Sequence, residues 1–167
     1  SPAGSAMPCP SPEISTEDLP YYQLVVAASE QYGIEISRIY ATMKAESDFD
    51  PKAVSRAGAR GLMQMMPSTY KDICKDMGIK YDPDDLFDPI VNIDVCTFYL
   101  KKQYERLGDW DLAHAAYNAG YMRVKSWLGD PRYSQDGKLV NIPIRETATY
   151  VKNINRYYSE YKAALED

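Results

Sequence analysis

Glycines divide the chain into segments with helical periodicity, and this division limits it to a mainly helical fold. Apolar residues in these segments recur three or four positions apart, and a glycine follows four of the segments, at positions 33, 78, 108 and 120. No alternating run of apolar and polar residues is long enough for a sheet, and there is no internal repeat. Helices are predicted up to Tyr32, over residues 38–47, 69–77, 91–107, 111–119 and 123–128, and from Pro143 to about Leu165.

Polar side chains and a proline mark the expected helix starts. A side-chain oxygen just before a helix accepts a hydrogen bond from a backbone amide of the first turn, and proline suits the first helical position. The expected caps and starting residues, in chain order, are Thr16 or Asp18, Ser37, Ser68 and Pro143.

The length of the chain favours one domain. Its 167 residues are enough for a sizeable core. We assign the domain to residues 16–167 and interpret residues 1–15, which are small and rich in proline, as a flexible tail or a cloning remnant. Residues 133–139 are expected to form a loop or a small β-turn excursion. The predicted fold class is therefore mainly α, with minimal β structure.

Charge and composition exclude several classes of function. The formal net charge of −5 argues against nonspecific binding to nucleic acid, which depends on many Lys and Arg contacts to phosphates. No apolar run approaches the roughly 20 residues that span a bilayer. His114 is the single histidine, so a histidine-based metal site or a Ser/His triad has little support, and His114 itself is expected to be a packing or partly exposed residue. We expect no cofactor and no metal.

Tyrosine dominates the aromatic residues, with 15 Tyr against 2 Trp and 3 Phe. A tyrosine offers a flat face and a hydroxyl, which suits a groove that binds sugar rings, but it also suits amphipathic packing between helices. Both interpretations stay open for each tyrosine.

Three cysteines leave at least one thiol without an intramolecular disulfide. Cys74 and Cys96 both fall in predicted helices, so they form either a disulfide in an oxidising compartment or two small buried thiols. The fate of Cys9, in the tail, stays open.

Glu46 occupies an unusual position in its predicted helix. Ile39, Met43 and Glu46 are spaced so that they share one face, which places the carboxylate at the end of an apolar stripe. Partial burial and the negative end of the helix dipole both raise the pKa of a carboxylate. A carboxylic acid that is still protonated near neutral pH can donate a proton to a leaving group. The alternative is a boundary glutamate whose carboxylate reaches water.

The segments that follow are suited to contact a ligand. The loop around Gly58 and Gly61 has little side-chain bulk, so its backbone can approach a ligand closely. Gln64 places an amide within an apolar run, and Asn118 precedes a helix-ending glycine. Taken alone, Asn118 shortly before Gly120 indicates no more than a helix end.

Three stretches carry a family resemblance. ESDFDPKAVSRAGARGLMQMMPST, AAYNAGYMRVKSWL and IPIRETATYVKNINRYYSEY resemble, in this order and spacing, the catalytic domain of soluble lytic transglycosylases over roughly residues 20–161. The resemblance implies a lysozyme-like, mainly helical fold similar to goose-type lysozyme, with a substrate groove. It also implies a peptidoglycan-cleaving enzyme, a glycan strand as its partner and a place in the periplasm or cell envelope.

The resemblance also assigns roles to individual residues. It makes Glu46 the single catalytic acid and base, with Ser47 holding either the substrate or Glu46. It gives Glu146 a structural hydrogen-bonding role. The residues that it implies around the substrate are Met63 and Gln64, which line the groove, Asn118 near the cleavage point with Tyr117 beside it, and Tyr150 with its hydroxyl near Glu46.

Three other functions compete with a lytic transglycosylase. Glycosidases that add water use two carboxylates. Of the second candidates here, Asp48 and Asp50 are not well placed, and Glu146, four residues before Tyr150, either faces the cleft or anchors the start of the last helix. A lysozyme-like hydrolase is therefore the first alternative, and a non-catalytic glycan-binding module is the second. The third is a partner-binding protein that uses the tyrosines of the last helix, Tyr150, Tyr157, Tyr158 and Tyr161, although their spacing also fits packing.

Overall fold

The protein is a bundle of helices with one very small hairpin, which confirms the mainly α fold class. The structure, a computed structural model, describes residues 15–165. Its α-helices are α1 (Tyr22–Tyr32), α2 (Ile36–Ser47), α3 (Pro67–Met77), α4 (Pro89–Leu107), α5 (Trp110–Ala119), α6 (Tyr121–Leu128) and α7 (Arg145–Leu165). Two short 3-10 helices, η1 (Thr16–Asp18) and η2 (Pro83–Phe87), and the strands β1 (Ser134–Gln135) and β2 (Lys138–Leu139) complete the described part.

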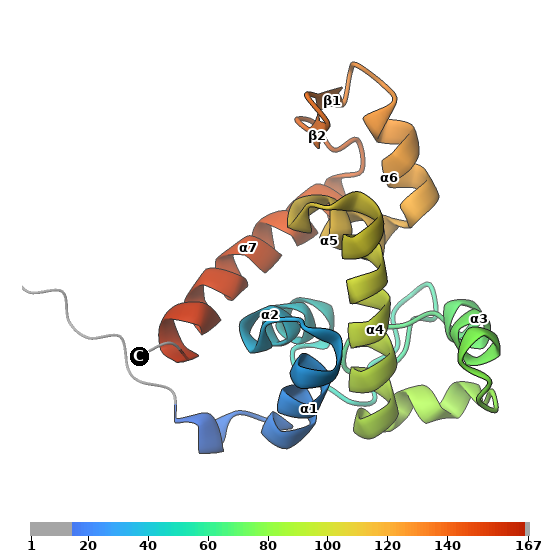
Figure 1. Cartoon of the computed structure of the whole chain (residues 1–167), viewed down its shortest axis with the longest axis vertical. Helices are drawn as coiled ribbons and strands as arrows, with labels where there is room; N and C mark the ends of the chain where they lie inside the picture. The colour runs from blue at the N-terminus through green and yellow to red at the C-terminus, as the bar shows by residue number, and fades with distance from the viewer. Residues whose placement is uncertain (1–14, 166–167) are drawn as a thin grey trace, which may run out of the picture.

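Helix α4 runs through the middle of the molecule, with α1 and α2 on one side and α3 on the other (Figure 1). Helix α5 packs against both α4 and α7, and α7 lies along α2 (Figure 1). The core between these helices contains fully buried side chains from several of them, including Ile39, Leu100 and Ile154. This packing holds the end of α2 and the first half of α7 in fixed relative positions.

The helix ends follow the glycines, as the sequence predicts. Gly33, Gly78 and Gly108 end α1, α3 and α4 in the left-handed conformation, and Gly120 ends α5. The small β excursion within residues 133–139 is also confirmed, because β1 and β2 pair antiparallel there.

Several predicted helix starts are wrong. Thr16 and Asp18 lie in η1, and Pro20 separates this turn from α1 because the residue before a proline disfavours the helical conformation. Helix α2 starts at Ile36, so Ser37 is a buried residue of its first turn and not a cap.

The starts of the third and last helices also differ from the prediction. Helix α3 begins at Pro67, so Ser68 lies inside its first turn and is not the cap. Proline suits the first position because it has no amide hydrogen there to satisfy. Helix α7 begins at Arg145, two residues after Pro143. Each of these differences is confined to one turn or to a short leading segment.

Both cysteines of the described part are free. Cys74 and Cys96 are fully buried, so the alternative of two small buried thiols is the one that the structure adopts. Cys9 and nearly all of the predicted tail lie outside the described residues.

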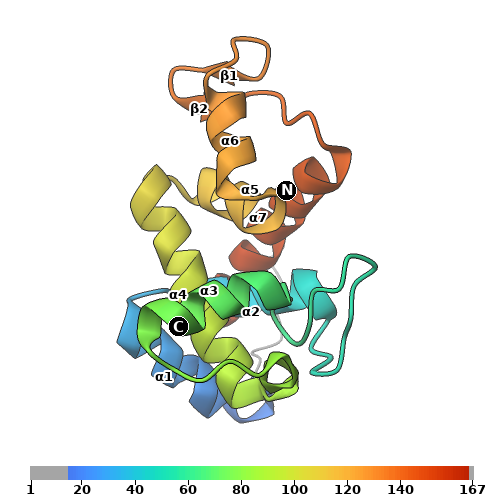
Figure 2. The ribbon, with the colours of Figure 1, turned by 90° about the vertical axis from the view of Figure 1, so that its right-hand side faces the viewer.

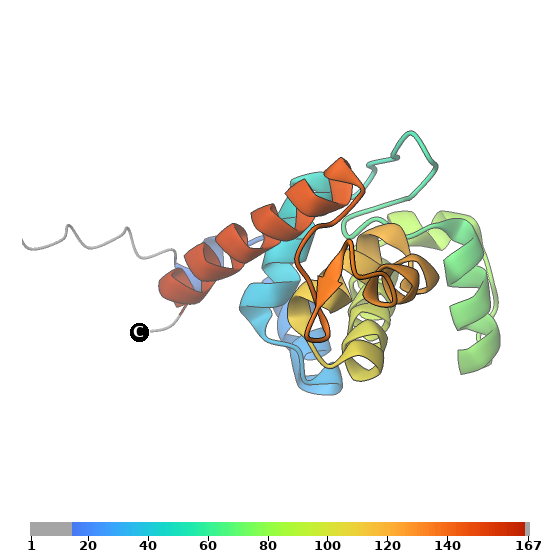
Figure 3. The same ribbon diagram turned by 90° about the horizontal axis from the view of Figure 1, so that it is seen from above.

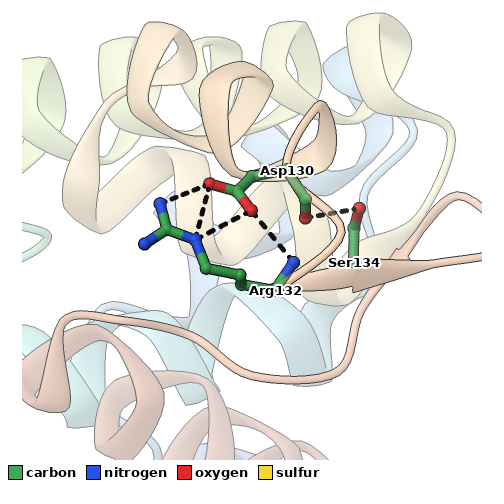
Figure 4. A network of polar contacts seen from close by, with 3 residues as sticks. All are labelled: Asp130, Arg132 and Ser134. Carbon is green, nitrogen blue, oxygen red and sulfur yellow. Dashed lines mark hydrogen bonds and ion pairs between the residues drawn. The ribbon is translucent and has the colours of Figure 1, made fainter.

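A compact turn after α6 leads into the hairpin. The Arg132 guanidinium donates hydrogen bonds to both carboxylate oxygens of Asp130, and the Ser134 hydroxyl donates to the Asp130 carbonyl (Figure 4). The hairpin lies beside α6 and at a distance from α1 and α3 (Figure 2).

Candidate active site

Glu46 lies in the last turn of α2 and is partly buried. Burial raises the pKa of its carboxyl to about 8, and the negative charge of Glu146 adds to this rise, while the Tyr150 hydroxyl opposes it. The side chain is therefore protonated near neutral pH and can act as an acid. The observed position agrees with the prediction from the apolar stripe of α2.

The chain leaves α2 through a sharp turn and forms a long loop, residues 48–66, which projects from the body near the start of α7 (Figure 3). Asp48 and Phe49 adopt left-handed backbone conformations, which reverse the direction of the chain. Isolated bridges pair Arg60 with Val54 and with Met65, so the loop folds back on itself. The loop thereby returns to the side of Glu46.

Ser47 fastens this loop to the helix that carries Glu46. Its hydroxyl donates a hydrogen bond of 2.6 Å to the Leu62 carbonyl. The predicted role of Ser47, to hold the substrate or Glu46, stays a prediction, but the hydroxyl is already engaged with the backbone of the loop.

Asn92, which no sequence motif singles out, holds the same loop from the other side. This fully buried side chain of α4 accepts a hydrogen bond from the Met63 amide at 2.8 Å. Its Nδ2 donates to the carbonyls of Arg60 at 3.0 Å and Leu86 at 2.9 Å. The sequence does place Asn92 four residues before Cys96, on the apolar face of a long helix. A buried amide needs hydrogen-bond partners, so this position indicates a structural role for Asn92.

Met63 does not line the cleft, contrary to the prediction. Its side chain is fully buried, and its backbone carbonyl accepts a hydrogen bond of 2.7 Å from the Tyr117 hydroxyl. An apolar side chain next to an anchored backbone segment turns into the core, because burial stabilises it there. Gln64 does reach the cleft, and its Nε2 donates to the carbonyls of Ala53 and Gly61.

Tyr117 and Asn118 form the wall of the cleft that α5 supplies. The ring of Tyr117 packs against Tyr99, with 5.5 Å between the ring centroids. The Thr147 hydroxyl donates a 2.8 Å hydrogen bond to Asn118 Oδ1 and so ties the end of α5 to the first turn of α7. No sequence pattern around Thr147 predicts this contact with α5.

Tyr150 reaches the site from α7. Its hydroxyl is buried and makes no hydrogen bond of acceptable geometry with the described residues. It is nevertheless close enough to Glu46 to lower the pKa of that carboxyl, and burial raises the pKa of the phenol well above its usual value. A buried hydroxyl without a partner, beside a partly buried acid, is available to a ligand atom that enters the cleft.

A buried polar pair packs behind Tyr150. The His114 ring lies 6.4 Å from the Tyr150 ring, and its Nε2 is 3.3 Å from Arg38 Nη1. Burial lowers the pKa of His114 to about 3, so its imidazole is neutral. His114 is thus a packing residue, as predicted, but it is fully buried and not partly exposed.

Glu146 lies as in the alternative that it faces the cleft, and the structural hydrogen-bonding role that the resemblance implies stays a prediction. It is exposed in the first turn of α7, faces the same cleft as Glu46, and makes no hydrogen bond with the described residues. The other two acids are engaged elsewhere, since Asp48 pairs with Lys44 and Asp50 accepts a hydrogen bond from the Lys52 amide. Glu146 is therefore the second carboxylate that the cleft contains.

The cleft extends to two sides of Glu46. One cavity, of about 200 Å³, lies toward the loop and α5 and includes Tyr99, Tyr117 and Thr69 in its walls. The other, of about 550 Å³, lies along α7 and includes Thr149 and Asn153. Both cavities share Glu46, Gln64 and Asn118, so a long ligand can pass across the acid.

Other types of site find no support in the residues described. No group of three or more His, Cys, Asp or Glu in this part of the chain is arranged to hold a metal ion. None of the helices between residues 15 and 165 is long and apolar enough to cross a membrane.

Comparison with known families identifies the domain. The sequence model of the transglycosylase SLT domain matches residues 23–140, which is most of the chain. The chain belongs to the transglycosylase SLT domain family. This confirms the resemblance on which the assignment of individual residues rests, although it does not test the roles of those residues.

Curated relatives of this SLT domain are much longer proteins. The soluble lytic murein transglycosylase of Escherichia coli (strain K12) is 39% identical over 142 residues, which cover 81% of this chain and 22% of the relative. The membrane-bound lytic murein transglycosylase C of Pectobacterium atrosepticum is 51% identical over 83 residues, or 48% of this chain and 23% of the relative. The chain thus spans about a quarter of the length of these relatives.

Solved structures of relatives share the fold of the SLT domain. The 70-kDa soluble lytic transglycosylase in complex with bulgecin A superimposes with a TM-score of 0.81 at 35% identity, covering 90% of this chain and 25% of that one. An inactive glutamate-to-glutamine mutant of lytic transglycosylase Slt from Pseudomonas aeruginosa superimposes with a TM-score of 0.79 at 36% identity. The match covers 89% of this chain and 25% of that one.

The raised pKa of Glu46 predicts a pH-dependent effect of Glu46→Gln on stability. The folded protein holds this proton more tightly than the unfolded chain, where a Glu pKa is about 4.3. The wild type therefore loses stability as the pH rises from about 4.3 through about 8, and the neutral glutamine does not. At about pH 9 the variant should be more stable by about 2–4 kcal/mol, after allowance for the partial exposure of Glu46.

Urea unfolding of both proteins at about pH 4 and about pH 9 measures this difference. At the lower pH the two free energies of unfolding should nearly coincide. A difference that does not change with pH would show that Glu46 is an ordinary solvated carboxylate.

Proposed function

We propose that the chain is a peptidoglycan lytic transglycosylase, which cleaves the β-1,4 bond between N-acetylmuramic acid and N-acetylglucosamine without water and leaves a 1,6-anhydro end. The observation that carries this proposal is a single partly buried acid, Glu46, with a pKa of about 8, at the junction of two cavities. Membership of the SLT domain family supports it. So do the names of the relatives, which are soluble or membrane-bound lytic murein transglycosylases.

In the proposed reaction Glu46 acts twice. The protonated carboxyl first donates its proton to the oxygen of the leaving N-acetylglucosamine, and the glycosidic bond breaks. The N-acetyl oxygen of the muramic acid stabilises the positive charge at the anomeric carbon. The Glu46 carboxylate then accepts the proton of the O6 hydroxyl, O6 bonds to the anomeric carbon, and the ring closes. Glu46 regains its proton and no water is consumed.

The neighbours of Glu46 suit the two protonation states that this reaction needs. Burial favours the acid at the start, and the Tyr150 hydroxyl favours the carboxylate that forms after the first step. Asn118 and Gln64 place amide groups in the walls of both cavities, where they can bind sugar hydroxyl and acetamido groups. Neither half of the proposed reaction needs a cofactor.

A lysozyme-like hydrolase is the second candidate, because Glu146 lines the same cleft as Glu46. In that reaction a second carboxylate activates a water molecule, and the product has a reducing end. Glu146 is exposed and makes no hydrogen bond with the described residues, so its position alone does not distinguish the two reactions.

Mass spectrometry of the fragments released from purified peptidoglycan tests the proposal. We expect muropeptides lighter by one water molecule than the reducing-end products of a hydrolase, with no incorporation of isotope-labelled water. Reducing-end products that carry the label would overturn the proposal in favour of the hydrolase. Absence of any release would favour a glycan-binding module.

The substrate also defines the setting that we propose for the protein. Peptidoglycan lies outside the cytoplasmic membrane, so the domain acts in the periplasm or elsewhere in the cell envelope on a glycan strand. We assign this activity to one domain over residues 16–167, which matches the extent of the helical pattern.

A further inference from the structure

One face of α7 continues beyond the cleft. Residues three or four apart on a helix share a face, and the first members of such a series, from Glu146 to Asn153, line the larger cavity beside Glu46. The later members, Tyr157, Glu160 and Tyr161, line a separate hollow of about 140 Å³ together with Lys44 of α2. We call this second cavity the distal hollow.

The distal hollow adjoins the cleft on both of its walls. On α2, Lys44 is next to Ala45, which lines the cleft. On α7, Tyr157 is one turn beyond Asn153 and two turns, or about 10 Å, beyond Tyr150. The same two helices thus border both cavities, and α7 lies along α2 throughout this part (Figure 1). A glycan strand that extends from Glu46 along α7 reaches the distal hollow after the larger cavity.

Packing accounts for two of the three tyrosines in this part of α7. The Tyr158 hydroxyl donates to the Glu35 carboxylate at 2.9 Å, and its ring lies 4.0 Å from the Arg38 guanidinium. Tyr161 stacks on the buried ring of Tyr40, with 5.5 Å between centroids and 25° between planes. Both rings therefore have structural partners.

Tyr157 has no such partner in the described core. Its ring is partly exposed and does not belong to the hydrophobic cluster that includes Tyr161. Its one aromatic contact is with the guanidinium of its neighbour Arg156, at 5.0 Å. The fold does not need an aromatic residue here, so its flat face is available to a ligand.

The chemistry of the distal hollow suits a sugar. The Tyr157 ring offers an apolar face for the carbon–hydrogen face of a pyranose. Lys44, which also pairs with Asp48, and Glu160 offer a donor and an acceptor for its polar groups. The opposite charges of these two residues favour an uncharged ring over a strongly charged ligand. Its small size distinguishes this hollow from an apolar protein-docking patch.

We propose that the distal hollow binds a further sugar of the glycan strand whose cleavage site lies over Glu46, with Tyr157 as the stacking surface. This proposal rests on the proposed function, because the ligand is the same peptidoglycan strand. It predicts that the protein binds long strands more tightly than fragments that fill the cleft alone.

The test measures binding without cleavage. The parent is Glu46→Gln, and the ligands are peptide-free glycan strands, either long or reduced to two disaccharide units, in isothermal titration calorimetry. Adding Tyr157→Ala to the Glu46→Gln parent should raise the dissociation constant for long strands about two- to tenfold, the range for one aromatic contact. The dissociation constant of the short fragment should not change.

Tyr121→Ala is the matched control. Tyr121 is also partly buried, lies outside the hydrophobic cluster, and has an arginine guanidinium, that of Arg106, 4.8 Å from its ring. It lies on α6 and lines neither the cleft nor the distal hollow. We expect this variant to bind both ligands as the parent does.

The outcomes separate this proposal from the proposed function. If Tyr157→Ala binds long strands as tightly as the parent, the distal site is wrong while binding of glycan to the cleft stands. Equal weakening by Tyr121→Ala would also overturn the distal site. If the Glu46→Gln parent binds neither ligand, the proposed function itself fails.

Discussion

Glu46→Gln should reduce the release of fragments from peptidoglycan about 10²–10⁴-fold, the usual contribution of a general acid or base. Glutamine keeps the size and polarity of the side chain but neither donates nor accepts the proton that the reaction moves. The folded structure should survive, because the wild-type side chain is already mostly uncharged near neutral pH. The rate of release of soluble fragments from purified peptidoglycan measures the effect.

Glu146→Gln is the control for this prediction. Glu146 lines the same cleft and also raises the pKa of Glu46 by its charge. If Glu46 acts alone, Glu146→Gln should change the rate less than tenfold and lower the pH at which activity declines, because the Glu46 carboxyl then loses its proton more readily. Comparable losses in both variants would mean that the two carboxylates act together, as in a hydrolase.

Gly61→Ala should destabilise the protein by about 3–5 kcal/mol, through backbone strain and the loss of buried hydrogen bonds. The backbone of Gly61 has a φ of +82°, which other residues rarely adopt. A β-carbon at this position would lie 2.1 Å from the Leu86 carbonyl oxygen and 2.3 Å from Asn92 Nδ2. Since Asn92 anchors the loop beside the cleft, activity should decline as well.

Thermal unfolding measures this effect, and Gly58→Ala is its matched control. Gly58 lies in the same loop with a φ of +96°, but a β-carbon there would meet no atom within 4 Å. The control should cost about 1 kcal/mol from backbone strain alone. The melting temperature of Gly61→Ala should therefore fall by about 10 °C and that of Gly58→Ala by much less. Equal changes would show that the close approach to Asn92 contributes nothing.

Local chemistry made some features of the fold predictable. Gly33 and Gly108 end helices because a left-handed residue completes the last turn, and this requirement is visible in the sequence. Glu46 lies three residues after the buried Met43 on the same helix, so the two side chains share a face. The sequence therefore predicts the partial burial of Glu46. Ser37 and Ser68 were misleading, because α2 begins at Ile36 and α3 at Pro67, so each serine lies inside the first turn and neither helix has a side-chain cap.

Tertiary contacts determined what could not be predicted. Asn92 acts on Met63 and Arg60, about 30 residues away in the sequence, and no local pattern shows that an amide of α4 will meet this loop. Met63 appeared to line the groove in the family pattern, but its fixed backbone turns its side chain into the core. The exposure of Glu146 in the cleft depends on how α7 docks, which the sequence of α7 alone does not reveal.

The place of α7 in the chain has a consequence for biosynthesis. Helix α7 supplies Tyr150 and the charge of Glu146 to the surroundings of Glu46, yet it follows all the other described elements in the sequence. A chain that folds from its N-terminus during synthesis reaches α7 last. Before α7 docks, Glu46 is more open to water and its pKa is closer to that of a free glutamate. The surroundings that raise the pKa of Glu46 are therefore complete only after α7 has docked against α2, so a domain that lacks α7 also lacks a finished environment for this acid.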